Sequence, residues 1–232
     1  MNFIDIIIII FIGLACIEGY KRGFIKTLFD TIGIIVAFFA SKELYYIVEE
    51  FLLKHTKLFA KIHDFFEIKA SGFTEILHNS SNDIANAFRE SLNLPIELQH
   101  MISNIFSNST STTNVDTLSV FVDNISIIVI RSISFLITFL VIYILLILAS
   151  NFINIMFKLP VLNLTNKLFG AITGALKAII ILYIAFALCS PIVGFVQDNT
   201  LVDGILKSES SKIFYDNNII LNYLSYKGFY EN

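Results

Sequence analysis

Two charged residues interrupt otherwise apolar stretches of the chain, and these are the residues best placed to do chemistry. Asp30 lies in the apolar run that begins at Phe24, and Lys177 lies in the run that ends before Pro191. A carboxylate or ammonium group in hydrocarbon is costly unless it pairs or reaches water, and such groups often mark proton or ion pathways. The sequence is therefore compatible with two roles for these residues. They could form an internal ion pair, or they could form a site that binds and releases a proton or an ion.

Two arrangements of these charges are compatible with the sequence. In the first, Asp30 and Lys177 are partners, because both lie on helices that leave short polar turns in the same direction and pairing lowers the cost of each buried charge. In the second, Asp30 reaches Lys26, four residues earlier on the same helix, while the long stem of Lys177 lets its ammonium group reach the membrane surface.

The remaining reactive side chains form no catalytic or ligand motif. The sequence has no His-Glu-x-x-His, no Gly-x-Ser-x-Gly and no phosphate-binding glycine loop, so an enzyme is the least favoured class. We expect no catalytic residue, no cofactor and no metal site. The histidines all fall within 42–124 without ligand spacing, and solvated helix faces explain them better than a metal: His55, His63, His78 and His100.

The two cysteines, Cys16 and Cys189, lie at the ends of apolar runs, where cysteine usually packs as a small hydrophobic residue. We expect no disulfide, because the predicted topology places them near opposite membrane faces, beyond the roughly 7 Å limit between Cα atoms. Lipid attachment is an alternative, because Gly13-Leu14-Ala15-Cys16 loosely resembles a lipid-attachment box. A retained helix is favoured, because Asp5 stands where a signal peptide needs cations.

The composition indicates that membrane-spanning helices position these residues. Of the 232 residues, 56% are hydrophobic and only 15% are charged, which is too apolar for a soluble domain of this size. The formal net charge of −3 gives no support for nucleic-acid binding.

We expect an all-α, polytopic membrane protein with four transmembrane helices in two antiparallel hairpins and a helical extracytoplasmic insertion. The predicted parts are a first hairpin over 1–41, the insertion over 42–124, a second hairpin over 125–195 and an extracytoplasmic tail over 196–232.

The short turns within each predicted hairpin are rich in cations, which predicts the orientation. Lys and Arg in short loops mark the cytoplasmic side, so both turns are expected inside, with both termini and the insertion outside. Two cations near outer helix ends, Lys42 and Arg131, count against this orientation. The cations of the turns are Lys21, Arg22, Lys26, Lys158 and Lys167.

Small residues recur at every fourth position in three of the predicted helices. Such stripes let two helix backbones approach closely, although glycine is also generally commoner in membrane helices than in soluble ones. We favour packing stripes over composition alone. They are Ala15, Gly19 and Gly23, then Gly33, Ala37 and Ser41, then Gly170, Gly174 and Ala178.

The predicted insertion, 42–124, contains amphipathic patterns rather than a structureless loop. Apolar residues follow helical spacing over 47–66, 73–88 and 95–106, with Pro95 at a helix start. These helices fit either a small extracytoplasmic cap that lies on the membrane or a spacer whose helices only cover one another.

Four short stretches make the chain resemble the colicin V production protein (CvpA) family. They are Asn2-Phe3-Ile4-Asp5, Gly19-Tyr20-Lys21-Arg22-Gly23-Phe24-Ile25, Leu168-Phe169-Gly170-Ala171 and Gly174-Ala175-Leu176-Lys177. The resemblance covers 1–41 and 125–195, and the long outer region and Leu159-Pro160-Val161-Leu162 are similar to the longer Gram-positive members. The chain departs from the family pattern at Asp30, where a small residue is usual, and at Thr27, where an acid is common. The resemblance marks these packing or motif residues: Asp5, Gly19, Arg22, Gly23, Phe24, Gly33, Gly170 and Gly174.

The resemblance implies a bacterial cytoplasmic membrane protein with a role in envelope function or in toxin production and secretion, and it implies no reaction. Two hypotheses follow. One is a membrane scaffold or partner-binding module that contacts the lipid bilayer and a membrane-protein partner or a second copy. The alternative is an oligomeric transporter or channel for a small solute or ion, which uses Asp30 and Lys177.

Overall fold

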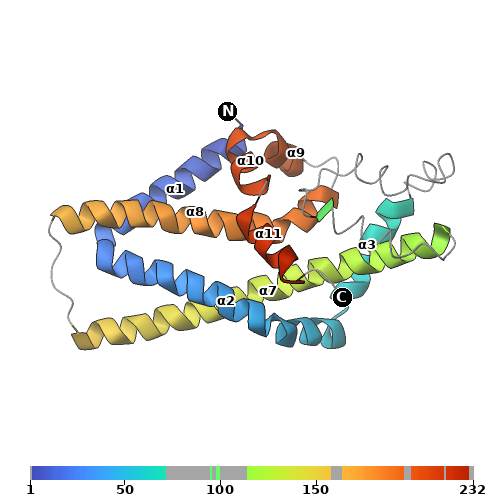
Figure 1. The fold of residues 1–232 in the computed structure, drawn as a ribbon, viewed down its shortest axis with the longest axis horizontal. Coiled ribbons are helices and arrows are strands. Elements are labelled where there is room, and N and C mark those ends of the chain that lie inside the picture. Colours follow the sequence, from blue (N-terminus) through green and yellow to red (C-terminus); the bar gives the residue numbers. More distant parts are fainter. Residues whose placement is uncertain are drawn as a thin grey trace.

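The computed structural model describes residues 2–71, 95, 98, 99, 114–157, 164–195, 200–216 and 218–229, and its regular structure there is helical throughout (Figure 1). The helices over these ranges are α1 (Phe3–Arg22), α2 (Phe24–His55), α3 (Leu58–Ser71), α7 (Asn114–Phe157), α8 (Leu164–Phe195), α9 (Thr200–Lys207), α10 (Glu209–Tyr215) and α11 (Ile219–Tyr226).

Four of these helices are long and apolar enough to cross a membrane, which confirms the expected all-α, polytopic class. The candidate spans are Phe3–Arg22 in α1, Phe24–His55 in α2, Val122–Ala149 in α7 and Leu164–Pro191 in α8. Their surfaces carry many exposed aliphatic and aromatic side chains, which is the surface expected of helices that face lipid.

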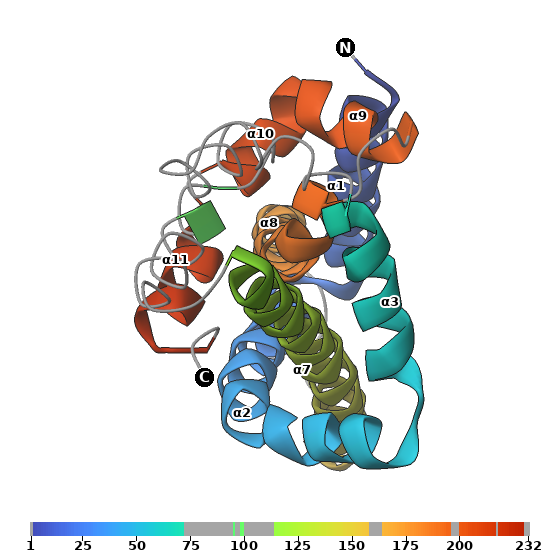
Figure 2. The ribbon, with the colours of Figure 1, turned by 90° about the vertical axis from the view of Figure 1, so that its right-hand side faces the viewer.

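Helix α8 lies at the centre of the bundle. It contacts α1, α2, α7, α10 and α11, and the view along the bundle shows these helices arranged around it (Figure 2). The main partner of α1 is α8, and the main partner of α2 is α7. The helices joined by a short turn therefore pack little on each other, and α1 and α2 diverge from the turn that joins them (Figure 1). The first two helices thus do not form the tightly packed pair that their short connection suggested.

Gly23 makes the reversal between α1 and α2 possible. Its φ of 80° lies in the left-handed region, which glycine adopts readily and other residues rarely do. Its N–H still donates to the Gly19 carbonyl at 2.8 Å, which closes the last turn of α1. The next amide, Phe24 N–H, donates to Asn166 Oδ1 of α8 at 3.0 Å, so a neighbouring helix caps the start of α2.

The main core lies where the middle of α2, the N-terminal half of α7 and the C-terminal half of α8 meet. Phe38 and Phe135 are buried there, with ring centroids 5.4 Å apart. Phe229, near the end of the chain, packs its ring 5.5 Å from Phe135 and 4.8 Å from Tyr45. Two leucines of α11, Leu221 and Leu224, are also fully buried in this cluster. The segment from α11 to Phe229 is therefore part of the bundle core.

Two of the predicted boundaries, after residues 41 and 124, fall inside continuous helices, so no break in helical structure marks them. Helix α2 runs from Phe24 to His55, across residue 41, and α7 runs from Asn114 to Phe157, across residue 124. The change from apolar to polar side chains along the sequence marks the helix leaving the apolar layer, and a helix does not have to end there. The expected helix over 47–66 is the outer part of α2 followed by α3, while those over 73–88 and 95–106 lie largely outside the described residues.

Candidate functional site

Four charged side chains gather where α1, α2 and α8 meet. Arg22 Nη1 lies 2.6 Å from Asp30 Oδ2, and Arg22 Nη2 lies 2.9 Å from Glu18 Oε1. Lys177 Nζ of α8 lies 3.6 Å from Glu18 Oε2 and 4.0 Å from Asp30 Oδ2. We name Glu18, Arg22, Asp30 and Lys177 the charge cluster, which contains two cations and two anions.

The four members differ in their access to solvent or lipid. The side chains of Asp30 and Lys177 are each 11% exposed, whereas those of Glu18 and Arg22 are 43% and 48% exposed. The cluster therefore has a buried half and an open half. Tyr143 of α7 lies within electrostatic range of Asp30, Glu18 and Arg22, so all four candidate spans contribute polar groups to this region.

This geometry falls between the two arrangements that the sequence left open. Asp30 and Lys177 are neighbours at the outer limit of an ion pair, and Lys177 is buried at a helix interface. The nearest cation to Asp30 is Arg22, which sequence reasoning did not assign to it. Lys26 is exposed and, among the described residues, no ion pair joins it to Asp30. A signal for Arg22 was present, because the turn at Gly23 brings residues on its two sides together.

Glycines set the distance between the helices that carry these charges. A Cβ added to Gly19 or Gly170 would overlap the carbonyl oxygen of the other residue, and one added to Gly174 would lie 3.0 Å from the Ala15 carbonyl carbon. The first and third predicted stripes are thus in direct backbone contact. In addition, the rings of Phe24 and Phe169 pack edge to face, with centroids 6.0 Å apart.

The middle stripe behaves differently. Ala37 and Ser41 are fully buried, but a Cβ on Gly33 would meet no described atom within 4 Å. The close packing expected at Gly33 is therefore not found in the described part of the chain. Spacing alone could not distinguish this glycine from Gly19 or Gly170.

Asp5 links the first turn of α1 to the C-terminal helices. Its carboxylate accepts hydrogen bonds from the Asn2 N–H, from Ser208 Oγ at 2.6 Å and from Ser210 N–H at 2.9 Å. The Asn2 side-chain amide donates to the Gly204 carbonyl at 2.8 Å. Asn2 and Asp5 also form a capping box, which satisfies backbone donors at the start of α1. The motif residue Asp5 thus anchors α9 and α10.

A second buried ion pair joins α7 to α2 and was not found from the sequence. Arg131 Nε lies 3.2 Å from Glu49 Oε1, with both side chains about nine-tenths buried. Arg131 also donates to the Phe229 carbonyl at 2.8 Å and lies 6.0 Å from the Tyr45 ring. The sequence marked Arg131 only as a cation near a predicted helix end, because its partners come from distant parts of the chain.

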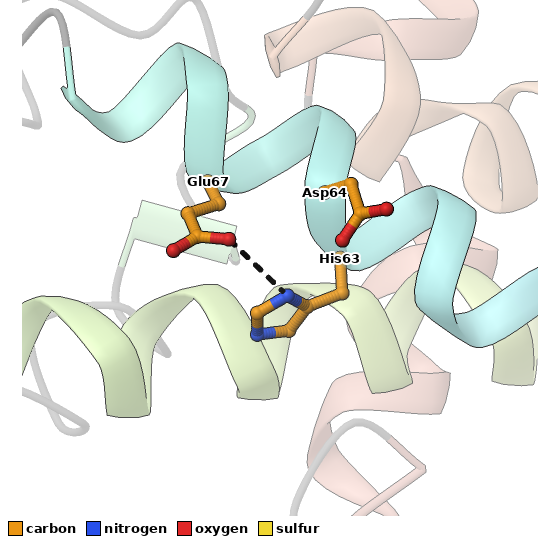
Figure 3. A group of neighbouring side chains, drawn as sticks. All are labelled: His63, Asp64 and Glu67. Atoms are coloured by element: carbon orange, nitrogen blue, oxygen red, sulfur yellow. Dashed lines mark ion pairs between the residues drawn. The ribbon is translucent and has the colours of Figure 1, made fainter.

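His63, Asp64 and Glu67 on α3 form the one group within the described residues that could hold a metal ion (Figure 3). His63 Nδ1 lies 3.9 Å from Glu67, and its other nitrogen, Nε2, lies 3.1 Å from Asp123 of α7. The two ring nitrogens point in different directions, so the imidazole bridges two carboxylates and ties α3 to α7. His55 packs beside Phe51 with ring centroids 5.1 Å apart, and His78 and His100 lie outside the described residues.

A family model described as Colicin V production protein matches residues 4–76 and 99–213. The chain belongs to this family. The match includes the Gly23 turn, the glycine contact of α1 with α8 and the whole charge cluster. No curated protein and no solved structure matched the chain. The family match and the four apolar helices both indicate a multi-pass membrane protein.

Proposed function

We propose that this colicin V production family protein is a non-enzymatic membrane scaffold that supports toxin production, secretion or envelope function by holding a partner protein. The observation that carries this proposal is the mutual pairing of Glu18, Arg22, Asp30 and Lys177. Charges that satisfy one another at a helix junction specify how the helices assemble. Such specification is a structural role.

The position of the charge cluster supports this interpretation. Arg22 precedes the Gly23 turn by one residue, and Glu18 is next to Gly19 at the contact with α8. The backbone contact and the ion pairs therefore reinforce one helix arrangement. A transporter has to break and remake such interactions during its cycle, whereas a scaffold gains from keeping them.

The outer part of α2 offers a surface for a partner. This helix has 32 residues, and about 20 are enough to span the hydrocarbon layer, so its last turns extend beyond it. Two large apolar side chains there, Ile47 and Phe51, are 54% and 57% exposed. Exposed apolar groups at an aqueous face are typical of protein contacts. We therefore place the partner on the outer half of α2.

The proposed location is the bacterial cytoplasmic membrane, with both termini and the outer half of α2 on the extracytoplasmic side. The cations at the inner turns support this orientation. Lys167 adds to that support, because its ammonium group lies 5.9 Å from the Tyr20 ring. Tyrosine and lysine together are typical of a membrane–water boundary.

The alternative is an oligomeric transporter or channel for a small solute or ion. The open half of the charge cluster favours it, since Glu18 and Arg22 remain nearly half exposed next to the buried Asp30 and Lys177. Three helices contribute to the cluster, and shared protons or ions often use such sites.

Two assays on the full chain, one in cells and one in liposomes, distinguish these functions. Toxin secretion and partner cross-linking are measured in cells that carry Ile47→Ser and Phe51→Ser, with the lipid-facing Ile35→Ser as the matched control. Proton and ion flux are measured in liposomes for the wild type, Asp30→Asn and Lys177→Gln. We expect the outer double variant to lose secretion and cross-linking while flux stays at background in every sample. Flux that depends on Asp30 and Lys177 would instead establish the transporter.

A further inference from the structure

Helix α11 contains no charged residue and packs on the transmembrane helices within their uncharged stretches. The Tyr223 ring lies 6.3 Å from the Phe38 ring and 6.0 Å from the Phe39 ring. Both phenylalanines lie on α2 between the charges of Asp30 and Lys42. Leu221 and Leu224 of α11 are fully buried against the same core. The contacts of α11 are therefore at the depth of membrane hydrocarbon.

A second contact places the start of α11 at a similar depth on α8. The Asn218 side chain donates to the Tyr183 carbonyl at 3.0 Å, and the Phe214 ring lies 5.1 Å from the Tyr183 ring. Tyr183 lies in the uncharged part of α8 that follows Lys177. Asn218 is fully buried and also caps α11 through the Ile220 and Leu221 amides. Its polar atoms are thus satisfied within the protein, as hydrocarbon requires.

Lys42 marks the upper edge of this layer. Its ammonium group lies 6.0 Å from the Tyr223 ring, and Lys42 follows Phe38 and Phe39 along α2. Tyr223 therefore lies between apolar rings and a cation. This is the position that tyrosine prefers at a membrane interface.

The side of α11 that faces away from the bundle is apolar and exposed. Ile219 is 71% exposed and Tyr226 is 81% exposed, and Lys227 Nζ lies 5.6 Å from the Tyr226 ring. Large apolar side chains at hydrocarbon depth need an apolar environment around them. Lipid acyl chains provide that environment, as they do for the exposed apolar side chains of α2 at the same depth.

We propose that α11 is embedded in the leaflet that also holds the N-terminal end of α1, with Ile219 and Tyr226 in contact with lipid acyl chains. Helix α9 and the start of α10 then lie at the headgroup level. Their hydrogen bonds to Asn2 and Asp5, in the first polar turn of α1, agree with that level. The C-terminal segment is thus an interfacial membrane element, a placement that the expected extracytoplasmic tail over 196–232 did not specify.

The absence of tryptophan from the sequence allows a direct test. Single tryptophans are introduced as Ile219→Trp and Tyr226→Trp in the full chain. Ile32→Trp on the exposed side of the α2 span is the lipid reference, and Lys57→Trp between α2 and α3 is the water reference. Each variant is placed in phosphatidylcholine vesicles with and without bromine near the top of the acyl chains. Iodide in the buffer is the aqueous quencher, and thermal unfolding identifies any variant that does not fold.

We expect brominated lipid to reduce emission at 219 and 226 about as strongly as at 32, roughly twofold, as for a helix that lies in the interface. Iodide should quench these positions several times less than position 57. Strong iodide quenching at both positions would overturn the proposal, because it would place α11 in water. Protection of both from iodide and bromine would also overturn it, because a second copy or a partner protein would then cover α11.

Discussion

Gly170 of α8 and Gly19 of α1 are in backbone contact, and neither position has room for a Cβ. This contact joins the first and last transmembrane helices of the chain directly. It also brings Glu18 and Arg22 of α1 to the level of Lys177 of α8. Two glycines without side-chain chemistry thus determine whether the charge cluster can form.

The first prediction concerns this contact. Gly19→Ala and Gly170→Ala should each destabilise the protein by about 1–3 kcal/mol, because the added methyl group forces the helices apart. Gly33→Ala and Gly13→Ala are matched controls, since a Cβ at either position meets no described atom within 4 Å. Unfolding in mixed detergent micelles measures the difference. Equal losses in all four variants would contradict the contact.

The second prediction concerns the charge cluster. In a double-mutant cycle, Asp30→Asn and Arg22→Gln should show a coupling energy of at least about 0.5 kcal/mol, because these side chains are in contact. The coupling of Asp30→Asn with Lys177→Gln should be weaker, since their closest atoms are 4.0 Å apart. Lys26→Gln serves as the control and should be additive with Asp30→Asn. Additive losses for Asp30 and Arg22 would show that they do not interact.

The third prediction concerns the attachment of the C-terminal helices. Asp5→Asn should release α9 and α10, because a neutral amide is a weaker acceptor for the Ser208 and Ser210 donors. Trypsin should then cleave at Lys207 and Lys212 several times faster than in the wild type. Asp203→Asn is the control, because Asp203 pairs only with the exposed Lys207 among the described residues. Unchanged cleavage in Asp5→Asn would refute this anchoring role.

The fourth prediction concerns orientation. A reporter that is active only in the cytoplasm should work when fused after Phe24 or Asn163, because the cations of both turns are retained inside. The same reporter should be inactive after Thr112 or at the C-terminus, and a periplasmic-type reporter should show the reverse pattern. Cytoplasmic activity after Thr112 would contradict the orientation.

Part of this architecture could be predicted from the sequence because its signals are local. The four apolar spans, the Gly23 turn and the two intramembrane charges are all visible in runs of neighbouring residues. Stripes at spacing four gave the same indication at Gly19, Gly170 and Gly33, whereas among the described residues an added Cβ would meet close backbone atoms at Gly19 and Gly170 and none at Gly33. A stripe of small residues shows that a helix surface allows close packing, but it does not show which helix packs against that surface.

The features that were missed depend on residues far apart in the chain. Arg131 and Glu49 are 82 positions apart, and no spacing rule connects them. The polar and apolar pattern of α9–α11 is short, so it did not reveal that Leu221 and Leu224 enter the core. Sequence polarity also did not indicate that α2 and α7 continue as helices across residues 41 and 124.

The bond between Asp5 and Ser208 also has a consequence in time. These residues are 203 positions apart, and at about 5–20 residues per second a ribosome needs on the order of 10–40 s to make the chain between them. During that interval the Asp5 carboxylate has only the Asn2 amide of these three donors, and α1 lacks its hydrogen bonds to Ser208 and Ser210. Residues synthesised long after α1 thus complete the hydrogen bonds of its first turn, and a chain released before Ser208 leaves the Asp5 carboxylate without them.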